Sequence, residues 1–437
     1  MLDSSVVNVA VEPIARELHA GLGVVQWTVS GYLLALGIGL AGTAYLSRRF
    51  GTLSVYRVSI ATFTLASVAC ALAPDLPALL AARVVQGLVA APLVPMAMSM
   101  LLGNNRSARS IPATAGMLLF LGPALGPSVG GALIAVAGWR AIFLINLPTG
   151  LGAVVAVRRL PPSMGSGPVD GSSRLDVTGL LLLAAGLGLL LLGITLGGTA
   201  GWAAFRSWLP LAAGGVLLSC YAVWARRTAQ PVLDIALARS RGPFLALTIC
   251  ALASVVTFSV VFLLPVFVQY AQGHSPLVTG IALLPQGIVT GLSTTLGQRA
   301  LRLVSVRVAV MAGFGLLTAA SASLVAVGAH TPLPVIAVLL AVRSVSIGLV
   351  IAPLLAVLTG PLRQAEIGDA STLFSIWQRV AGSLGVGLIA AIFTRQAAAA
   401  GPVAALHLTA VVLAAIAAAG LGAAAALPAG RVEPLVA

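Results

Sequence analysis

The feature that most constrains this chain is a series of apolar segments, each about as long as a helix that crosses a bilayer. Such a helix needs about 20 residues to cross about 30 Å of hydrocarbon. Only 8% of the 437 residues are charged and 59% are hydrophobic, whereas soluble domains carry about 25% charged residues. The sequence therefore predicts an all-α polytopic membrane protein. Thirteen segments are long enough to span, at residues 24–46, 54–73, 78–101, 112–136, 141–157, 178–198, 209–225, 244–270, 277–297, 304–327, 332–357, 372–394 and 406–427.

A shorter apolar stretch, residues 1–14, precedes these segments. At about 1.5 Å per residue its helix would be about 21 Å long, which is too short to cross the hydrocarbon core. We interpret it as the end of a first helix, which brings the predicted number of spans to fourteen, the first one truncated. This interpretation also predicts a longer native N-terminus. Thirteen spans with an external N-terminus are the alternative.

The distribution of arginine residues predicts the orientation. With a cytoplasmic N-terminus, seventeen of the 24 basic residues fall in cytoplasmic loops and four in external loops, and the thirteen-span alternative gives the same loop sides. Loops rich in basic residues stay in the cytoplasm, so we expect a multi-pass plasma-membrane protein with both termini cytoplasmic. The net charge of +14 forms no basic patch interleaved with aromatic residues, so we expect the lipid bilayer and no nucleic acid as a partner.

A long polar stretch, rich in Pro, Gly and Ser, divides the chain after the sixth segment. Its composition is typical of a flexible linker. Eight segments follow it, so two inserted helices beside two halves of six would give the plan of transporters that are built from two similar halves. The predicted organisation is an N-terminal half at 1–157, a cytoplasmic linker at 158–177, two inserted helices at 178–225, a cytoplasmic loop at 226–243, a C-terminal half at 244–427 and a cytoplasmic tail at 428–437.

Several stretches match a known family in order and spacing. They are LDSSVVNVAVEPIARELHA (2–20), QWTVSGYLLALGIGLAGTAYLSRRFG (26–51), ARVVQGLVAAPLVP (82–95), GPALGPSVGG (122–131), GWRAIFLINLPTG (138–150), FLLPVFVQYAQGHSPLVTGIALLPQG (262–287) and RVAGSLGVG (379–387). Through them the chain resembles the fourteen-span drug:proton antiporters (EmrB/QacA type) of the major facilitator superfamily. The resemblance covers nearly the whole chain. It implies a major-facilitator fold with two six-helix halves plus two extra helices.

Asp3 and Arg83 are the predicted proton-coupling residues. Asp3 is the acidic residue that the sequence places in a membrane helix, where burial changes how readily a carboxyl group takes up a proton. Arg83 lies in an otherwise uncharged segment, at a cost of at least about 2.5 kcal/mol. The resemblance implies a coupling role for both. The alternatives are a solvated residue near a chain end for Asp3 and a snorkelling side chain for Arg83. Arg343 and Arg379 raise the same question in the second half, where a structural role is equally expected.

A run of poor helix formers lies in the segment at 112–136. Gly122, Gly126, Pro127, Gly130 and Gly131 fit the family signature GxxxGPxxGG. The glycines at 122, 126 and 130 recur every four residues, so they lie along one helix face and let another helix approach closely. We expect a bend and a close-contact hinge for the gate. A glycine packing seam without a role in antiport is the alternative.

The first cytoplasmic loop is the predicted gating loop, with Gly42, Arg48, Arg49 and Gly51. The resemblance implies an acidic residue near the position of Arg48, and this chain has none there. These arginines can equally serve the topology alone.

The resemblance implies secondary active multidrug efflux, which is proton-driven antiport of amphipathic drug-like compounds by alternating access. The energy source would be the proton gradient, and no cofactor or metal is expected. A pocket for such compounds is apolar with a few aromatic and polar groups. The candidates are Gln26, Trp27, Tyr32, Gln269 and Tyr270. An interfacial aromatic belt is the alternative for them.

An enzyme is not expected, because the sequence has no HExxH motif, no Walker-type loop and no clustered carboxylates in its membrane segments. The alternative function is a major-facilitator transporter or sensor of another specificity, including nutrient import, with weakened proton coupling. An envelope adaptor protein as a partner stays open.

Overall fold

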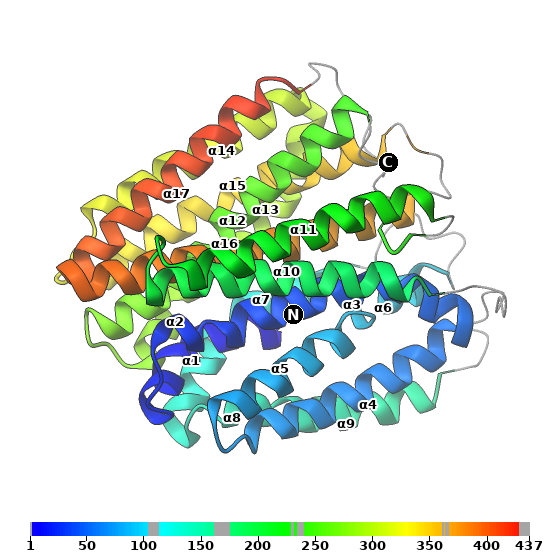
Figure 1. Cartoon of the computed structure of the whole chain (residues 1–437), viewed down its shortest axis with the longest axis horizontal. Coiled ribbons are helices and arrows are strands. Elements are labelled where there is room, and N and C mark those ends of the chain that lie inside the picture. The colour runs from blue at the N-terminus through cyan, green and yellow to red at the C-terminus, as the bar shows by residue number, and fades with distance from the viewer. Residues whose placement is uncertain are drawn as a thin grey trace.

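The computed structural model describes residues 2–103, 113–160, 175–228, 231–233, 240–360, 362 and 367–427. Within these ranges the regular secondary structure is helical, which confirms the all-α prediction. The long helices run side by side along one direction (Figure 1). Most of the predicted linker, part of the loop at 226–243 and the tail at 428–437 lie outside the described residues.

In the part of the chain that the structure describes, nine helices form the first part of the bundle. Two predicted segments near its start, 24–46 and 78–101, are each made of two consecutive helices, and Pro92, which lacks an N–H group, stands at the break in the second. Asp75 caps the helix that carries Arg83, because its carboxylate accepts from the Ala78 amide at 2.8 Å. The helices are α1 (Leu2–Glu17), α2 (Leu22–Val25), α3 (Trp27–Phe50), α4 (Thr52–Ala71), α5 (Leu76–Ala90), α6 (Leu93–Gly103), α7 (Ala113–Ala137), α8 (Ala141–Leu144) and α9 (Asn146–Arg158).

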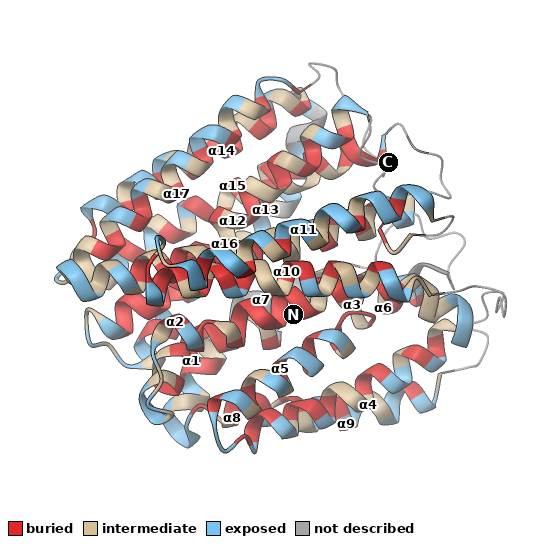
Figure 2. Cartoon of the chain, viewed as in Figure 1, coloured by how far each residue is buried: buried red, intermediate tan, exposed pale blue. Residues whose placement is uncertain are grey.

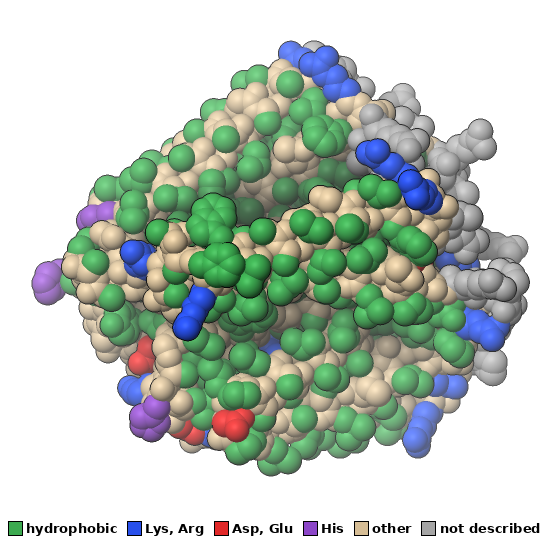
Figure 3. Space-filling view, in the orientation of Figure 1, with side chains coloured by type: hydrophobic (Ala, Val, Ile, Leu, Met, Phe, Trp, Pro, Cys, Tyr) green, Lys and Arg blue, Asp and Glu red, His purple; other side chains and the backbone are tan. Residues whose placement is uncertain are grey.

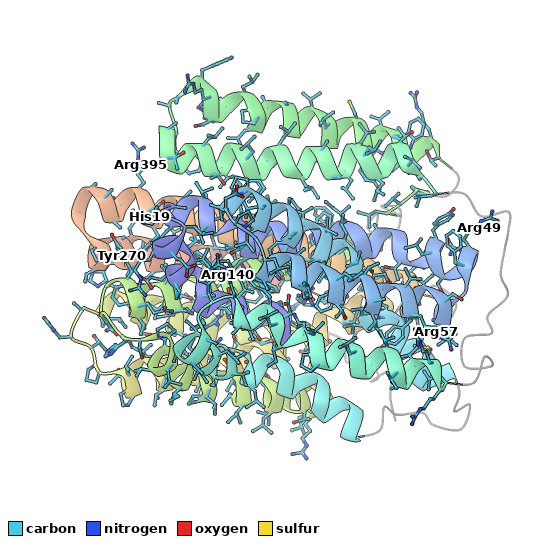
Figure 4. All side chains as sticks on the ribbon, turned by 90° about the horizontal axis from the view of Figure 1, so that it is seen from below. His19, Arg49, Arg57, Arg140, Tyr270 and Arg395 are labelled. Atoms are coloured by element: carbon cyan, nitrogen blue, oxygen red, sulfur yellow. The ribbon has the colours of Figure 1, made fainter. Side chains whose placement is uncertain are left out.

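Two further helices, α10 (Val177–Ala200) and α11 (Phe205–Arg227), fall on the range predicted for the inserted pair. They pack on each other, and α10 also packs against α3 and α16. In Figure 4 the pair forms a layer on one side of the bundle. The inserted helices therefore contact helices from both predicted halves.

The remaining helices form the second half. The helix α14 begins after Ser305, whose side chain accepts from the Val308 amide as an N-cap. The helices are α12 (Arg241–Tyr270), α13 (Pro276–Leu303), α14 (Val306–Ser323), the short 3₁₀ helix η3 (Leu324–Ala326), α15 (Leu333–Thr359), α16 (Ile367–Ala400) and α17 (Pro402–Ala424). Contacts between the halves join α1 to α12, α3 to α16 and α7 to α13.

Twelve described spans are long and apolar enough to cross a membrane. They match twelve of the predicted segments. The helix α1 has 16 residues, and α7 has 25, of which most side chains before Leu125 lie outside the described residues. The structure therefore supports a polytopic membrane protein, and the number of fourteen spans stays a prediction.

The outside of the bundle is apolar along its length. Large hydrophobic side chains such as Leu65 and Val136 are 69% and 88% exposed, and exposed residues line the outer faces of helices whose inner faces are buried (Figure 2). Figure 3 shows hydrophobic side chains over the visible sides, whereas most visible charged and His side chains lie toward the ends. This distribution is what a bilayer around the bundle requires.

The labelled residues of Figure 4 divide between the two ends of the bundle. Arg49 and Arg57 lie at one end, and His19 and Arg395 lie toward the other. Arg140 contacts Glu17, which ends α1 two residues before His19. We call the two ends the Arg49 end and the His19 end. The orientation prediction places the same two groups on opposite faces of the membrane, with the Arg49 end in the cytoplasm.

Candidate functional site

A buried ion pair joins the two residues that the sequence predicted for proton coupling. Arg83 Nη1 donates to Asp3 Oδ2 at 2.8 Å, and the two side chains are 1% and 5% exposed. Asp3 comes from the first turn of α1, and Arg83 comes from the middle of α5. Asp3 is thus buried rather than solvated, and Arg83 points into the protein rather than snorkelling. Their role in coupling stays a prediction.

Three neutral polar side chains complete the pair. Gln86 accepts from Arg83 Nη1 at 2.6 Å and donates to Asp3 Oδ1 at 3.3 Å. Asn146 donates to the same Asp3 oxygen at 2.8 Å. Ser67 Oγ accepts from Gln86 at 2.7 Å and from Asn146 at 3.2 Å. The carboxylate therefore accepts three hydrogen bonds from side chains on α5 and α9.

The guanidinium of Arg83 is held on its other sides by α3 and α8. Its Nε donates to the Thr28 carbonyl at 3.0 Å. Its Cζ lies 4.0 Å from the ring centroid of Tyr32 and 5.6 Å from that of Phe143. A buried ion pair recovers its desolvation cost only with such additional partners. Together these residues form what we call the Asp3 cluster: Asp3, Thr28, Tyr32, Ser67, Arg83, Gln86, Phe143 and Asn146.

The helix α1 connects the Asp3 cluster to the contact between the two halves. Val6, one turn after Asp3, lies against Gly130 of α7, where an added Cβ would be 2.8 Å from Val6 Cγ1. The carbonyl of Val9 accepts from Gln269 of α12 at 3.0 Å. At the end of α1, Glu17 accepts from Trp139 Nε1 at 2.9 Å. Six residues, fewer than two helical turns, thus separate Asp3 from a contact of α1 with the second half.

The glycine motif lies where α7 meets both α1 and α13. A Cβ on Gly131 would be 2.3 Å from the Pro276 carbonyl, and a Cβ on Gly280 would be 2.3 Å from the Pro127 carbonyl. Ser128 Oγ donates to the Gly280 carbonyl at 2.8 Å. The predicted close approach between helices is therefore present. At Gly131 it joins α7 to α13, a helix of the other half. Gly126 is buried and Gly122 is half-buried, whereas the Pro123 side chain lies outside the described residues.

The predicted gating loop is a tight turn at the Arg49 end. Gly51 has a φ of +80°, which explains glycine there. Arg48 and Arg49 are exposed in the last turn of α3. Gly42 is buried, and an added Cβ there would meet nothing within 4 Å.

The structure does not bring the five predicted substrate-binding residues together. Gln26 and Trp27 both donate to Thr195 of α10, at 3.4 and 2.9 Å, so they hold the inserted pair. Tyr32 lies under Arg83, Gln269 contacts α1, and Tyr270 is 55% exposed at the His19 end. Each of the five therefore has its own surroundings in this structure, and their part in substrate binding stays a prediction.

The arginines of the second half differ from Arg83. Arg379 is half-buried on α16, and its Cζ lies 5.9 Å from the Phe258 ring centroid. Arg343 is 1% exposed on α15, and none of its three guanidinium nitrogens has a hydrogen-bond partner in the part of the chain that the structure describes.

The arrangement defines a class of protein, a helical multi-pass membrane protein with a buried charged cluster beside the contact between its halves. A model of the Major Facilitator Superfamily matches residues 1–386, and the chain belongs to this family. It is a transporter rather than an enzyme. A crystal structure of a mutant of the nucleoside transporter NupG covers 97% of this chain and 95% of its own at a TM-score of 0.61 and 11% identity, which shows a shared fold.

Sequence relatives carry names that refer to resistance and export. A multidrug resistance protein B homolog from Mycobacterium tuberculosis is 32% identical over 90% of this chain and 74% of its own. The methylenomycin A resistance protein of Streptomyces coelicolor is 29% identical over 90% of this chain and 82% of its own. The multidrug export protein EmrB of Escherichia coli is 31% identical over 66% of this chain and 57% of its own.

Proposed function

We propose that this protein is an efflux transporter that exports amphipathic drug-like compounds in exchange for protons, as a member of the fourteen-span antiporters. The names of the sequence relatives support export of drugs. The observation that carries the coupling step is the Asp3–Arg83 pair, since a buried carboxylate held by a permanent cation is a group whose protonation changes local packing.

Protonation of Asp3 would remove the charge that compensates Arg83. A proton on Oδ2, the oxygen that Arg83 contacts, turns that oxygen into a donor and leaves the two N–H contacts of Oδ1, so three donors would no longer converge on a negative charge. Arg83 would then turn toward Thr28, Tyr32 and Gln86 alone. The helix α1 contacts α7 and α12 one to two turns after Asp3. Loss of the Asp3–Arg83 ion pair would therefore free α1 from α5 and loosen the contact between the halves.

Several of the close contacts between the halves lie near the His19 end, including Gly131 against Pro276 and Gln269 against Val9. In an alternating-access cycle these contacts would open to release the substrate outside and close again around a deprotonated Asp3. The Arg49 end would face the cytoplasm of the cell across the plasma membrane. The proton gradient would then supply the driving force, with no cofactor.

The test is coupling in everted vesicles or proteoliposomes with an imposed proton gradient. We expect substrate-dependent proton release in the wild type and a loss of it in Asp3→Asn. Asp369→Asn is the matched control, because Asp369 is exposed at the start of α16. Full proton release by Asp3→Asn would remove Asp3 from the mechanism. Resistance of an efflux-deficient host to dyes, quaternary ammonium compounds and antibiotics tests the substrate class, and uptake of a nutrient without efflux would favour import.

A further inference from the structure

Arg343 is a buried charge that the proposed transport cycle does not use. Its side chain is 1% exposed, and Nε, Nη1 and Nη2 all lack hydrogen-bond partners among the described residues. Arginine keeps its charge in proteins and has five N–H donors. A charged group that is buried without a partner is strongly unfavourable, and arginine inside a membrane protein marks a functional position by default.

No acidic side chain that the structure describes in the second half is placed to neutralise Arg343. The helices α12, α13, α14, α15 and α17 contain no Asp or Glu. Asp369 of α16 is exposed at the start of its helix. Water would satisfy the N–H groups of Arg343 but would leave its charge uncompensated.

The face of α15 that carries Arg343 packs against α14. A Cβ on Gly313 of α14 would lie 2.6 Å from Val350 Cγ2 and 3.3 Å from the Ser346 carbonyl. Arg343 precedes Val350 by seven residues, which is about two turns, so it lies on the same face of α15.

Ser321 lies at the matching position on α14. It follows Gly313 by eight residues, so both are on one face of α14. The two helices are consecutive and pack antiparallel on each other (Figure 1). Because the helices are antiparallel, Ser321 is displaced from Gly313 along α14 in the same direction, and by about the same distance, as Arg343 is displaced from Val350 along α15. Ser321 and Arg343 therefore lie at similar heights along the two helices. The Ser321 hydroxyl is 0% exposed and, within the described ranges, has no hydrogen-bond partner either.

We propose that Arg343 and Ser321 form an anion-binding site inside the second half of the protein. The guanidinium supplies the charge and parallel N–H donors, and the serine supplies an O–H donor. The ligand chemistry is a single negative charge with hydrogen-bond acceptors. It comes either from solution as a small inorganic ion such as chloride or from a carboxylate group on an organic compound. This site requires neither a direction of transport nor the role proposed for Asp3.

Thermal unfolding of the purified full-length protein tests the site. Chloride or benzoate replaces a bulky sulfonate, 2-morpholinoethanesulfonate, at constant ionic strength. A ligand that binds only the folded protein raises its unfolding temperature in a saturable way. We expect such a rise in the wild type, its loss in Arg343→Met, and at least a tenfold weaker apparent affinity in Ser321→Ala. Arg395→Met, which removes an exposed arginine at the His19 end, should keep the full rise.

The two ligands separate the two sources of the anion. A rise with chloride alone identifies an inorganic ion, and a rise with benzoate alone identifies an organic carboxylate, provided that Arg343→Met removes it. Arg343→Lys keeps the charge without the planar fork and is expected to bind at least tenfold more weakly, so it serves where the Met variant does not fold. The absence of a saturable rise in the wild type with either anion, or an unchanged affinity in both Arg343 variants, would overturn the proposal.

Discussion

The two halves of the protein share a helical hairpin with a similar sequence, but the polar side chains inside the hairpin have different partners in each half. The sequence GLVAAPL at 87–93 on α5 and α6 returns as GLVIAPL at 348–354 on α15, and each follows a buried arginine. The preceding helices, α4 and α14, each carry a buried serine fifteen residues after their first residue, Ser67 and Ser321. In the first half the arginine and serine belong to the Asp3 cluster, and in the second half both lack partners in the described part of the chain.

The difference begins with register. Arg83 precedes its glycine by four residues, whereas Arg343 precedes Gly348 by five. One residue turns a helical side chain by about 100°. Arg83 consequently points to α1 and α3, where Asp3 and the Thr28 carbonyl lie, and Arg343 shares a face with residues that pack on α14. The shared motif thus preserves helix packing, and the charge placement decides that Arg83 pairs with a carboxylate, whereas Arg343 has no partner among the described residues.

Removal of the Arg83 charge should have the largest effect on stability. Arg83→Met leaves the Asp3 carboxylate buried without its cation, and loss of one partner from a buried pair costs about 3–5 kcal/mol. We expect a marked fall in unfolding temperature for the purified protein. The double variant Arg83→Met/Asp3→Asn should recover part of it, because it no longer buries a lone charge. An unchanged unfolding temperature in Arg83→Met would show that the pair does not hold α1 to α5.

The matching change in the second half should act in the opposite direction. Arg343→Met replaces a buried charge that has no partner among the described residues by an apolar chain, which removes the desolvation cost of that charge, so we expect no loss of stability or a gain. The measurement is again thermal unfolding, in the sulfonate buffer without chloride or benzoate. A loss as large as that of Arg83→Met would mean that Arg343 has a partner within the protein, which would remove the contrast between the halves.

The sequence predicted the charged members of the Asp3 cluster and missed the neutral ones. Asp3 and Arg83 stand out because charges are costly in a membrane segment. Gln86, Ser67 and Asn146 do not, because neutral polar residues are tolerated along many spans and their partners come from distant helices. One local signal was available, since Gln86 follows Arg83 by three residues and therefore lies on the same face of α5.

The predicted substrate-binding residues show a different limit of the sequence. Gln26 and Trp27 have the composition of a binding site, but they contact Thr195 of the inserted helix α10. Periodicity within one helix shows which face is polar, and it does not show whether that face meets a ligand or another helix. The glycine motif was more informative. Two helices can approach closely only where side chains are small, so glycines on one helix face directly indicate a close helix contact.

The glycine contacts of the repeated motif should be equally sensitive in the two halves. A Cβ on Gly87 would lie 2.6 Å from the Tyr32 carbonyl, and one on Gly297 would lie 2.0 Å from the Gly348 carbonyl. Overpacking of this kind costs about 1–3 kcal/mol, so Gly87→Ala and Gly297→Ala should lower the unfolding temperature by similar amounts. Gly188→Ala on α10, where an added Cβ meets nothing within 4 Å, is the control. A loss in one half only would show that the packing has diverged along with the charges.

The smallest expected effect separates the two serines. Ser67→Ala removes the acceptor of Gln86 and Asn146, and loss of such a hydrogen bond costs about 1 kcal/mol. Ser321→Ala removes a hydroxyl that has no partner among the residues the structure describes, so we expect no loss of stability in the sulfonate buffer. With a saturating anion, Ser321→Ala should also lower the unfolding temperature, because it removes a hydrogen-bond donor to the bound anion. The difference in stability loss between the two variants should then shrink. Equal losses for both variants without any anion would place a protein acceptor beside Ser321 and make the second half a complete polar cluster like the first.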